Sequence, residues 1–208
     1  MHCLGRDGGS SIGAMGAQPA TASPLVRRYT LEEFWELEAP PEGGHYELIA
    51  GVLYVVPPPT GPHNIAISNL TGMFIRYLDA HPGAGRLFVP RAAVWRPDWV
   101  TWLEPDLFLV TAERLRTTDA GRLATADLVV EALSTGSATY DRTAKADTYA
   151  ALGVRELWLV DLERKAIEQR VLEADRWRVL GVHAGSAAFE SAVFPGLIVL
   201  PADVFAFA

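Results

Sequence analysis

Cysteine is almost absent from this chain of 208 residues, in which Cys3 is the only one. A single cysteine has no partner for a disulfide within the chain, so an apolar core has to hold the fold together. Half of the residues are hydrophobic, which is enough for a substantial core in one domain of this length. The lack of disulfides fits a reducing compartment, and we expect a cytoplasmic location.

Long apolar stretches are absent as well. No run of residues approaches the length of a membrane span. The first residues are rich in Gly, Ser and Ala and contain no apolar segment of signal-peptide length. We predict a disordered leader over residues 1–24, a single folded domain over residues 25–208, and no association with a membrane.

Positive charge is in short supply: the net charge is −7, and lysine occurs only twice beside sixteen arginines. This balance argues against a large electrostatic contact surface for nucleic acid, whose nonspecific binding depends on Lys and Arg. Arginines do gather in two stretches, which fits either a basic strip on an acidic body or scattered solvated side chains. The two groups are Arg86, Arg91 and Arg96, and Arg114, Arg116 and Arg122.

Several well-known catalytic motifs are missing. The chain has no P-loop, no Gly-x-Ser-x-Gly elbow and no His-Glu-x-x-His pair. Residues 83–88 begin like a dinucleotide-binding fingerprint, but the final glycine is absent and the segment follows a predicted helix where a strand is required. The sequence therefore offers no support for the chemistry that these motifs carry.

The first half of the chain contains signals for helices and a hairpin. Thr30 and Glu33 have the spacing of a capping box, which predicts a short helix from residue 31. Turn residues and the spacing of apolar residues predict the elements that follow. These are a hairpin over residues 46–56 that turns at Ala50-Gly51, an amphipathic helix over residues 64–79 and a strand over residues 86–95.

The second half reads as strands that alternate with a helix. Continuous apolar runs at residues 107–110 and 128–133 are typical of central strands that are covered on both faces. A helical pattern over residues 137–152 stops at Gly153, which suits a left-handed cap. The order predicts an α/β fold with a central mixed β-sheet flanked by helices and a C-terminal β-hairpin. The last elements are a strand at residues 155–161 and a hairpin of residues 166–172 and 177–182.

Two sets of apolar residues leave alternatives open. The C-terminal segment, residues 192–208, can pack either on the core of its own domain or on a second subunit. The six tryptophans could serve in stacking or sugar binding. Because Trp35, Trp95 and Trp158 stand in apolar patterns, we predict that these three are core residues.

Two acidic residues stand beside the apolar runs of the predicted central strands. Asp106 follows Pro105 at the start of the first run, where it can serve chemistry or merely end the strand. Glu131 interrupts the second run. Burial of a carboxylate among such neighbours is costly unless a cation or a metal ion meets it, which favours a functional role for Glu131.

Lys145, one of only two lysines, lies on the helix that follows these strands. A surface ion pair with Asp141, four residues earlier, is the ordinary explanation for such a lysine. The three residues together suggest more, because two acids at neighbouring strand ends can chelate a divalent ion while the compact ammonium group reaches the same point. Mg²⁺ accepts few protein carboxylates and keeps several waters, which suits so sparse a set.

Several short motifs follow one another between residues 29 and 182. They are Tyr46-Glu47-Leu48-Ile49-Ala50-Gly51, Pro62-His63, Pro105-Asp106, Val130-Glu131-Ala132-Leu133-Ser134, Lys145, Tyr149 and Gly153-Val154-Arg155-Glu156-Leu157-Trp158-Leu159-Val160-Asp161. In this combination they resemble the bacterial Uma-two family of proposed restriction endonucleases, which belongs to the PD-(D/E)XK nuclease superfamily.

The resemblance implies a restriction-endonuclease-like core and assigns roles to five residues. Asp106 and Glu131 would be metal ligands, with the backbone carbonyl of Ala132 as a third. The ion would be Mg²⁺, for which Mn²⁺ can substitute. Lys145 would lie near the attacking water, and Glu47 would be an upstream acid of the same catalytic site.

One position departs from the superfamily pattern. That pattern has its lysine two residues after the second acid, but Leu133 stands there in this chain. In the family that the chain resembles, the lysine is thought to have moved to the following helix, so Lys145 would replace it. The site would be incomplete if Lys145 pointed elsewhere.

His63 and Glu47 each have more than one interpretation. His63 follows Gly61-Pro62 directly before the predicted helix, where its imidazole can contact a phosphate of the substrate, cap the helix or face solvent. Glu47 can belong to the site, as the resemblance implies, or it can be an acid on the surface of the hairpin.

These observations predict a Mg²⁺-dependent endonuclease that hydrolyses phosphodiester bonds in DNA. Because one such centre cuts one strand, cleavage of both strands would need a homodimer. Two other interpretations remain open. The chain can be a nuclease fold that has lost catalysis and acts in binding or assembly, which its acidic charge favours, or a small-molecule hydrolase that uses the same metal site.

Overall fold

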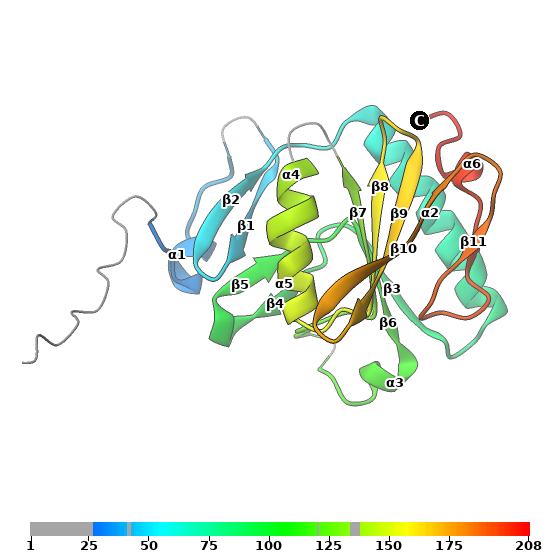
Figure 1. The fold of residues 1–208 in the computed structure, drawn as a ribbon. Coiled ribbons are helices and arrows are strands. Elements are labelled where there is room, and N and C mark those ends of the chain that lie inside the picture. Colours follow the sequence, from blue (N-terminus) through cyan, green and yellow to red (C-terminus); the bar gives the residue numbers. More distant parts are fainter. Residues whose placement is uncertain (1–26, 41–42, 120, 134–137) are drawn as a thin grey trace, which may run out of the picture.

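The computed structural model describes residues 27–40, 43–119, 121–133 and 138–208 (Figure 1). The leader predicted for residues 1–24 lies outside these ranges. Within them, no helix combines the length and the hydrophobicity that crossing a membrane requires. The described residues form two main β-sheets with helices beside them.

The larger sheet has, among the described residues, six strands in the order β10-β9-β8-β7-β6-β3. β7 and β8 run parallel, and the other neighbours run antiparallel. The predicted mixed sheet and the hairpin of β9 and β10 are therefore confirmed. The bounds are β3 (Gly85–Phe88), β6 (Leu107–Thr111), β7 (Leu128–Leu133), β8 (Glu156–Asp161), β9 (Ala166–Glu173) and β10 (Arg176–Ala184).

The smaller sheet has the order β2-β1-β5-β4, and β1 and β2 form the hairpin predicted for residues 46–56. The prediction of one strand over residues 86–95 is wrong, because β3 joins the larger sheet and β4 the smaller one. Pro90 lacks a backbone donor and Arg91 has a φ of 76°, so the chain leaves one sheet before it enters the other. The bounds are β1 (His45–Ile49), β2 (Val52–Val56), β4 (Val94–Arg96) and β5 (Thr101–Leu103).

The helices of the first half begin at their capping residues. α1 (Leu31–Trp35) starts at the predicted capping box, in which Thr30 and Glu33 each accept a hydrogen bond from the backbone of the other. α2 (Gly61–Ala80) begins three residues earlier than predicted, because the Thr60 hydroxyl caps its first turn. A 3₁₀ turn, η1 (Pro97–Trp99), and a short helix, α3 (Ala112–Leu115), follow.

The helix predicted for residues 137–152 has three parts. α4 (Ala138–Tyr140) leads into the π-helical segment η2 (Asp141–Lys145), and α5 (Ala146–Ala151) completes it. Gly153 has a φ of 79°, which confirms the predicted left-handed end. Single π-helical turns inside α-helices occur frequently at functional sites, so the residues of η2 are candidates for a functional role.

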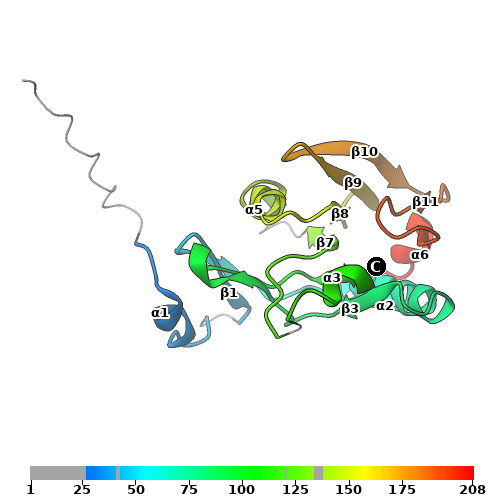
Figure 2. The same cartoon turned by 90° about the horizontal axis from the view of Figure 1, so that it is seen from below.

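The side chains of β7 alternate between two hydrophobic cores. Leu128, Val130 and Ala132 belong to the core that includes α2, whereas Val129 and Leu133 belong to the core that includes α5. Figure 2 shows α2 and α5 on opposite sides of the larger sheet. All six residues of β7 are buried, as predicted for a central strand.

The C-terminal segment packs on its own domain. Glu156 at the start of β8 accepts hydrogen bonds from Ser191 Oγ at 2.6 Å and from Val193 N at 3.0 Å. Of the two alternatives for residues 192–208, packing on the domain's own core is therefore the one observed. The buried apolar residues are Phe194, Leu197, Val199, Val204 and Phe205, and the elements are β11 (Phe189–Glu190), β12 (Ile198–Val199) and α6 (Pro201–Val204).

The predicted core tryptophans divide between interior and surface. Trp158 is fully buried, as predicted. The prediction for Trp35 is wrong, because this residue is 54% exposed on the short helix α1. Its ring meets the rings of Trp95 and Trp102 edge-on, and Trp95 is partly buried. Aromatic contacts thus hold α1 against the smaller sheet without burying it.

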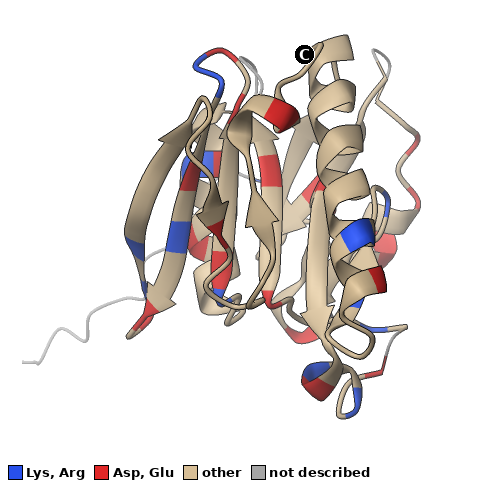
Figure 3. Ribbon diagram, turned by 90° about the vertical axis from the view of Figure 1, so that its right-hand side faces the viewer, with Lys and Arg blue, Asp and Glu red and all other residues tan. Residues whose placement is uncertain are grey.

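Three of the six arginines in the two groups, Arg91, Arg96 and Arg114, form ion pairs with acids. Arg114 contacts the buried Asp127, and Arg96 contacts Asp98. Figure 3 shows Lys and Arg interspersed with Asp and Glu on the face that it displays. These contacts favour dispersed arginines over a continuous basic strip.

Asp127 should be a major contributor to stability, because its carboxylate is 1% exposed and fully hydrogen-bonded. It accepts bonds from Thr111 N at 2.8 Å and Thr111 Oγ1 at 2.9 Å, and from Arg114 Nε at 3.0 Å and Nη2 at 2.8 Å. We expect Asp127→Asn to lower the free energy of unfolding by about 3 kcal/mol at neutral pH. Urea unfolding would measure this, with the exposed Asp175→Asn as the matched control.

The same substitution has a defined pH dependence. Burial opposes ionisation of Asp127, but its donors outweigh burial and lower the pKa of this carboxyl group. Its stabilising effect is therefore present above the unfolded pKa of about 3.9 and is lost as the pH falls through the lower folded value. The difference between wild type and Asp127→Asn should shrink in that acidic range. A difference that stays constant into strong acid would contradict this assignment.

Candidate active site

Asp106 and Glu131 meet at one end of the β6–β7 pair. Leu107 lies opposite Val130, so continuing the antiparallel register by one residue brings Asp106 opposite Glu131. The Ala132 N–H donates to Asp106 Oδ2 at 2.8 Å, which ties Asp106 to β7. Alternation along β7 turns Glu131 toward the side of α5, where it is 3% exposed. The two acids that the sequence singled out are thus neighbours.

The ammonium group of Lys145 reaches acids from both sheets. Its Nζ lies 2.8 Å from Glu131 Oε1, 3.2 Å from Glu47 Oε1 and 3.7 Å from Asp141 Oδ1. Lys145 is 2% exposed, so the alternative of a surface ion pair is wrong. The pair with Asp141 exists, but it lies in the interior. Lys145 therefore points toward the acids, as the site requires.

Glu47 comes from the smaller sheet and is fully buried, so the alternative of a surface acid on the hairpin is wrong. Its Oε1 accepts a hydrogen bond from Glu104 N at 2.8 Å, and its Oε2 accepts one from Tyr140 OH at 3.0 Å. Because Glu47 and Glu131 belong to different sheets, their shared contact with Lys145 joins the two sheets at this point.

Two tyrosines complete the cluster, and neither has a role in the sequence-based prediction. Tyr149 OH donates to Glu131 Oε1 at 2.5 Å, and Tyr140 OH donates to Glu47. Burial, together with the neighbouring carboxylates, raises the pKa of both tyrosines, so both stay neutral donors. The spacing of four residues between Lys145 and Tyr149 was an available signal. Tyr140 meets an acid 93 residues away, which local spacing cannot reveal.

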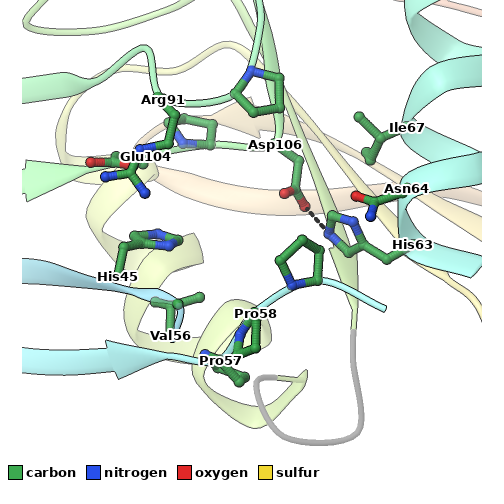
Figure 4. A pocket seen from close by; sticks show the side chains of 14 residues that line it. His45, Val56, Pro57, Pro58, His63, Asn64, Ile67, Arg91, Glu104 and Asp106 are labelled. Atoms are coloured by element: carbon green, nitrogen blue, oxygen red, sulfur yellow. Dashed lines mark hydrogen bonds and ion pairs between the residues drawn. The ribbon is translucent and has the colours of Figure 1, made fainter. Parts of the chain in front are cut away.

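His63 points toward Asp106 from the first turn of α2. It is 8% exposed, and its Nε2 lies 3.1 Å from Asp106 Oδ2 (Figure 4). The solvent-facing interpretation is therefore wrong, and the hydroxyl of Thr60 rather than the imidazole caps the helix. Burial alone would lower the pKa of His63, but the contact with Asp106 outweighs it and raises this pKa.

Negative charge exceeds positive charge in this buried cluster. The carboxylates of Glu47, Glu131 and Asp141 contact the one ammonium group of Lys145, and that of Asp106 contacts His63 beside them. Burial, reinforced by the other carboxylates, raises the pKa of Glu131 well above its usual range although Lys145 opposes the change. Glu131 and Glu47 overcome the effect of burial and raise the pKa of Lys145. The cluster thus has spare capacity for a cation.

The type of donor atom in the cluster fits a hard divalent ion. Within the described residues, no group of three or more His, Cys, Asp or Glu side chains has the arrangement of a metal site. Mg²⁺ nevertheless accepts oxygen ligands from as few as one or two carboxylates and retains several waters. Asp106 and Glu131 supply such oxygens, and the hydrogen bond from Ala132 N brings its backbone beside them.

Comparisons with known proteins give one family and one solved structure of similar fold. The family model of Uma2, described as "Putative restriction endonuclease", matches residues 31–203. A solved structure of a "putative nuclease belonging to DUF820" from Anabaena variabilis ATCC 29413 has a TM-score of 0.68 and 19% sequence identity, covering 86% of this chain and 98% of that chain. At this identity the likeness shows a common fold, which confirms the predicted fold class. No match was found among curated proteins.

Removal of the Lys145 ammonium group should lower the stability of the folded protein. We expect Lys145→Met to lower the free energy of unfolding by about 3–5 kcal/mol, because it leaves buried carboxylates without their cation. The other lysine provides a matched control, since Lys165 is exposed and its Nζ contacts only the Ala208 carbonyl among the described residues. Urea unfolding of Lys145→Met and Lys165→Met would measure the difference. Equal stabilities would show that Lys145 does not hold the cluster together.

Proposed function

The chain belongs to the Uma2 family, and on that basis we propose that it is a metal-dependent endonuclease that hydrolyses phosphodiester bonds in DNA. The name of the solved structure with the same fold also denotes a nuclease. Both comparisons point to hydrolysis of phosphodiester bonds. The choice of DNA rests on the description of the family, and the need for a metal ion rests on the chemistry of the cluster.

The observation that carries this proposal is the excess of carboxylates over ammonium groups at the meeting point of the two sheets. Three acids, Glu47, Glu131 and Asp141, share one lysine, and each of them is almost fully buried. Buried acids normally have partners, because an isolated buried charge is costly. A divalent cation would supply the missing positive charge.

Asp106, Glu131 and the Ala132 carbonyl are the groups that would hold Mg²⁺. When bound, this ion polarises a phosphodiester and lowers the pKa of a coordinated water. Asp106 is the most accessible of these acids, with a side chain that is 21% exposed. A phosphate of the substrate would therefore approach from the side of Asp106.

Lys145 would orient the attacking water or stabilise the negative charge that develops on the phosphoryl oxygens. Glu47 is a positioning residue in this scheme, because it contacts Lys145 while Tyr140 and the Glu104 N–H hold it in place. Tyr149 positions Glu131 in the same way. The neutral tyrosines fix both carboxylates without adding charge.

His63 would contact a phosphate oxygen beside the bond that is cut. Its raised pKa favours the imidazolium form, which donates hydrogen bonds to anions. Its contact with Asp106 places it at the accessible edge of the cluster.

The acidic net charge of −7 favours a second candidate function, in which the fold has lost catalysis and acts in binding or assembly. In that case the carboxylates would serve stability alone. A third possibility, a small-molecule hydrolase, would use the same metal ion without affinity for DNA. The first experiment below separates these functions.

Asp106→Ala should abolish nicking of supercoiled plasmid in Mg²⁺ or Mn²⁺, because it removes a proposed metal ligand. Loss of such a charge-stabilising group typically lowers the rate by about 10²–10³-fold or more. EDTA should stop the wild-type reaction, and Asp98→Ala, which alters an exposed acid, should leave it unchanged. Cleavage that persists in Asp106→Ala excludes Asp106 from the mechanism. The absence of DNA cleavage together with metal binding and no affinity for DNA would favour the small-molecule hydrolase, whereas the absence of both cleavage and metal binding would favour the module that has lost catalysis.

We also propose that cleavage of both strands requires a homodimer, because a single centre cuts one strand. Sedimentation equilibrium with a DNA duplex should then detect two protein chains on the species that yields linear plasmid. Nicked circles alone, formed by a monomer, would contradict the dimer and leave the single-strand reaction intact.

A further inference from the structure

A cavity of about 260 Å³ opens beside Asp106 and His63. Val56, Pro57, Pro58 and Ile67 form apolar parts of its wall. Figure 4 shows His45 and Glu104 on one side of this cavity and Asp106 and His63 on the other. The cavity therefore adjoins the proposed cleavage site directly.

Unsatisfied polar atoms concentrate in this cavity. In the part of the chain that the structure describes, three buried side-chain atoms lack a hydrogen-bond partner: His45 Nε2, His63 Nδ1 and Glu104 Oε2. All three residues line the cavity. A buried polar atom without a partner typically costs free energy, so such atoms in a native protein call for an explanation. A ligand that supplies hydrogen bonds provides one.

Glu104 is the best placed of these groups. Its side chain is 10% exposed, and its Oε1 already accepts a hydrogen bond from Trp102 Nε1 at 3.2 Å. Its Oε2 lies 3.3 Å from Arg91 Nε in an ion pair, but without the geometry of a hydrogen bond. Glu104 Oε2 is therefore a buried acceptor without a hydrogen bond, on a residue that lines the cavity.

The charges of the cavity limit what can enter it. The carboxylate of Glu104 disfavours a phosphate on the side of the cavity that lies opposite Asp106 and His63. A metal ion is disfavoured on that side as well, because Glu104 is its only lining carboxylate among the described residues and already forms an ion pair with Arg91. A neutral group that carries N–H donors and has flat apolar faces matches the walls and the free acceptor.

We infer that this cavity binds an unpaired nucleobase of the nucleotide next to the cleaved phosphodiester, an inference that rests on the proposed nuclease function. Enzymes that hold a single base place it between apolar side chains and contact its Watson–Crick edge with polar groups. Val56, Pro57 and Ile67 supply the apolar surface, and Glu104 Oε2 accepts a hydrogen bond from an exocyclic amino group. The volume lies below the range of about 300–1,000 Å³ for drug-sized ligands, which suits one base.

An unpaired base in the cavity determines which form of DNA can bind. The Watson–Crick edge of a base in a duplex is already paired, so Glu104 cannot contact it there. The cavity therefore selects single-stranded DNA, or a nucleotide that has been turned out of the helix. Cytosine and adenine carry exocyclic amino groups and thymine does not, so strands of cytosine or adenine should bind more tightly than strands of thymine.

Binding is measured by fluorescence anisotropy with labelled single strands, in Ca²⁺ instead of Mg²⁺ and with strand integrity checked on a gel. The probes are oligo-dC, oligo-dA, oligo-dT, an abasic strand of equal length and a mixed-sequence duplex. Oligo-dC and oligo-dA should bind roughly tenfold more tightly than the abasic strand, which corresponds to one hydrogen bond to a charged group. Equal affinities for oligo-dC and the abasic strand, or no binding of any strand, would overturn the inference.

Glu104→Gln replaces the acceptor Oε2 by an amide that donates, while the remaining oxygen can still accept from Trp102. This variant should lose the preference for oligo-dC over the abasic strand. Glu36→Gln, which removes an exposed acid at the end of α1, is the matched control and should keep the preference. An unchanged preference in Glu104→Gln would contradict the role of its carboxylate.

Asn64→Trp provides a second variant that does not depend on Glu104. Asn64 is an exposed residue of α2 that lines the cavity, so a large side chain there blocks the entrance without disturbing the core. Base preference should disappear in this variant too, and its persistence would place the base elsewhere. Base preference without plasmid nicking would refute the proposed function alone, whereas nicking without base preference would refute this inference alone.

Discussion

The structure depends on the contact of one buried ammonium group with acids from two sheets. Lys145 lies 2.8 Å from Glu131 of the larger sheet and 3.2 Å from Glu47 of the smaller one. Without this ammonium group the buried carboxylates would have no cation, which is usually far more costly than the ion pairs themselves are stabilising. The π-helical segment η2, the neutral donors Tyr140 and Tyr149, and the junction of the sheets all serve to maintain this arrangement.

A second constraint follows from the number of acids. One lysine cannot neutralise the three carboxylates that contact it, so the cluster keeps an excess of negative charge in the interior. The same end of the molecule contains the three buried polar atoms that lack partners among the described residues. Unsatisfied charge and unsatisfied hydrogen bonds thus occur side by side, at Asp106 and in the adjoining cavity. Proteins keep such costly features where they bind something, and here the two features match the metal ion and the nucleobase that we propose as ligands.

Much of the fold was accessible from local patterns. The capping box at Thr30 and Glu33, the buried run of β7 and the left-handed end at Gly153 depend on residues close together in the chain. Two predictions about the fold were wrong, and each error has a local physical cause. Residues 86–95 look like one strand because apolar spacing does not register that Pro90 and Arg91 redirect the chain. Trp35 looks like a core residue because a short helix at the edge of a sheet has no second layer to cover it.

The residues of the candidate site also fall into two sets, those that the sequence identified and those that only the structure brought together. The sequence by itself determined which groups are chemically unusual: two acids beside apolar runs and one of only two lysines, for which burial without a partner is too costly. Only the tertiary structure decided that Glu47 is interior, that Tyr140 holds it, and that His63 meets Asp106 at 3.1 Å. These contacts join residues 43 and 93 positions apart. Their geometry arises from the packing of two sheets and a helix, which no local spacing encodes.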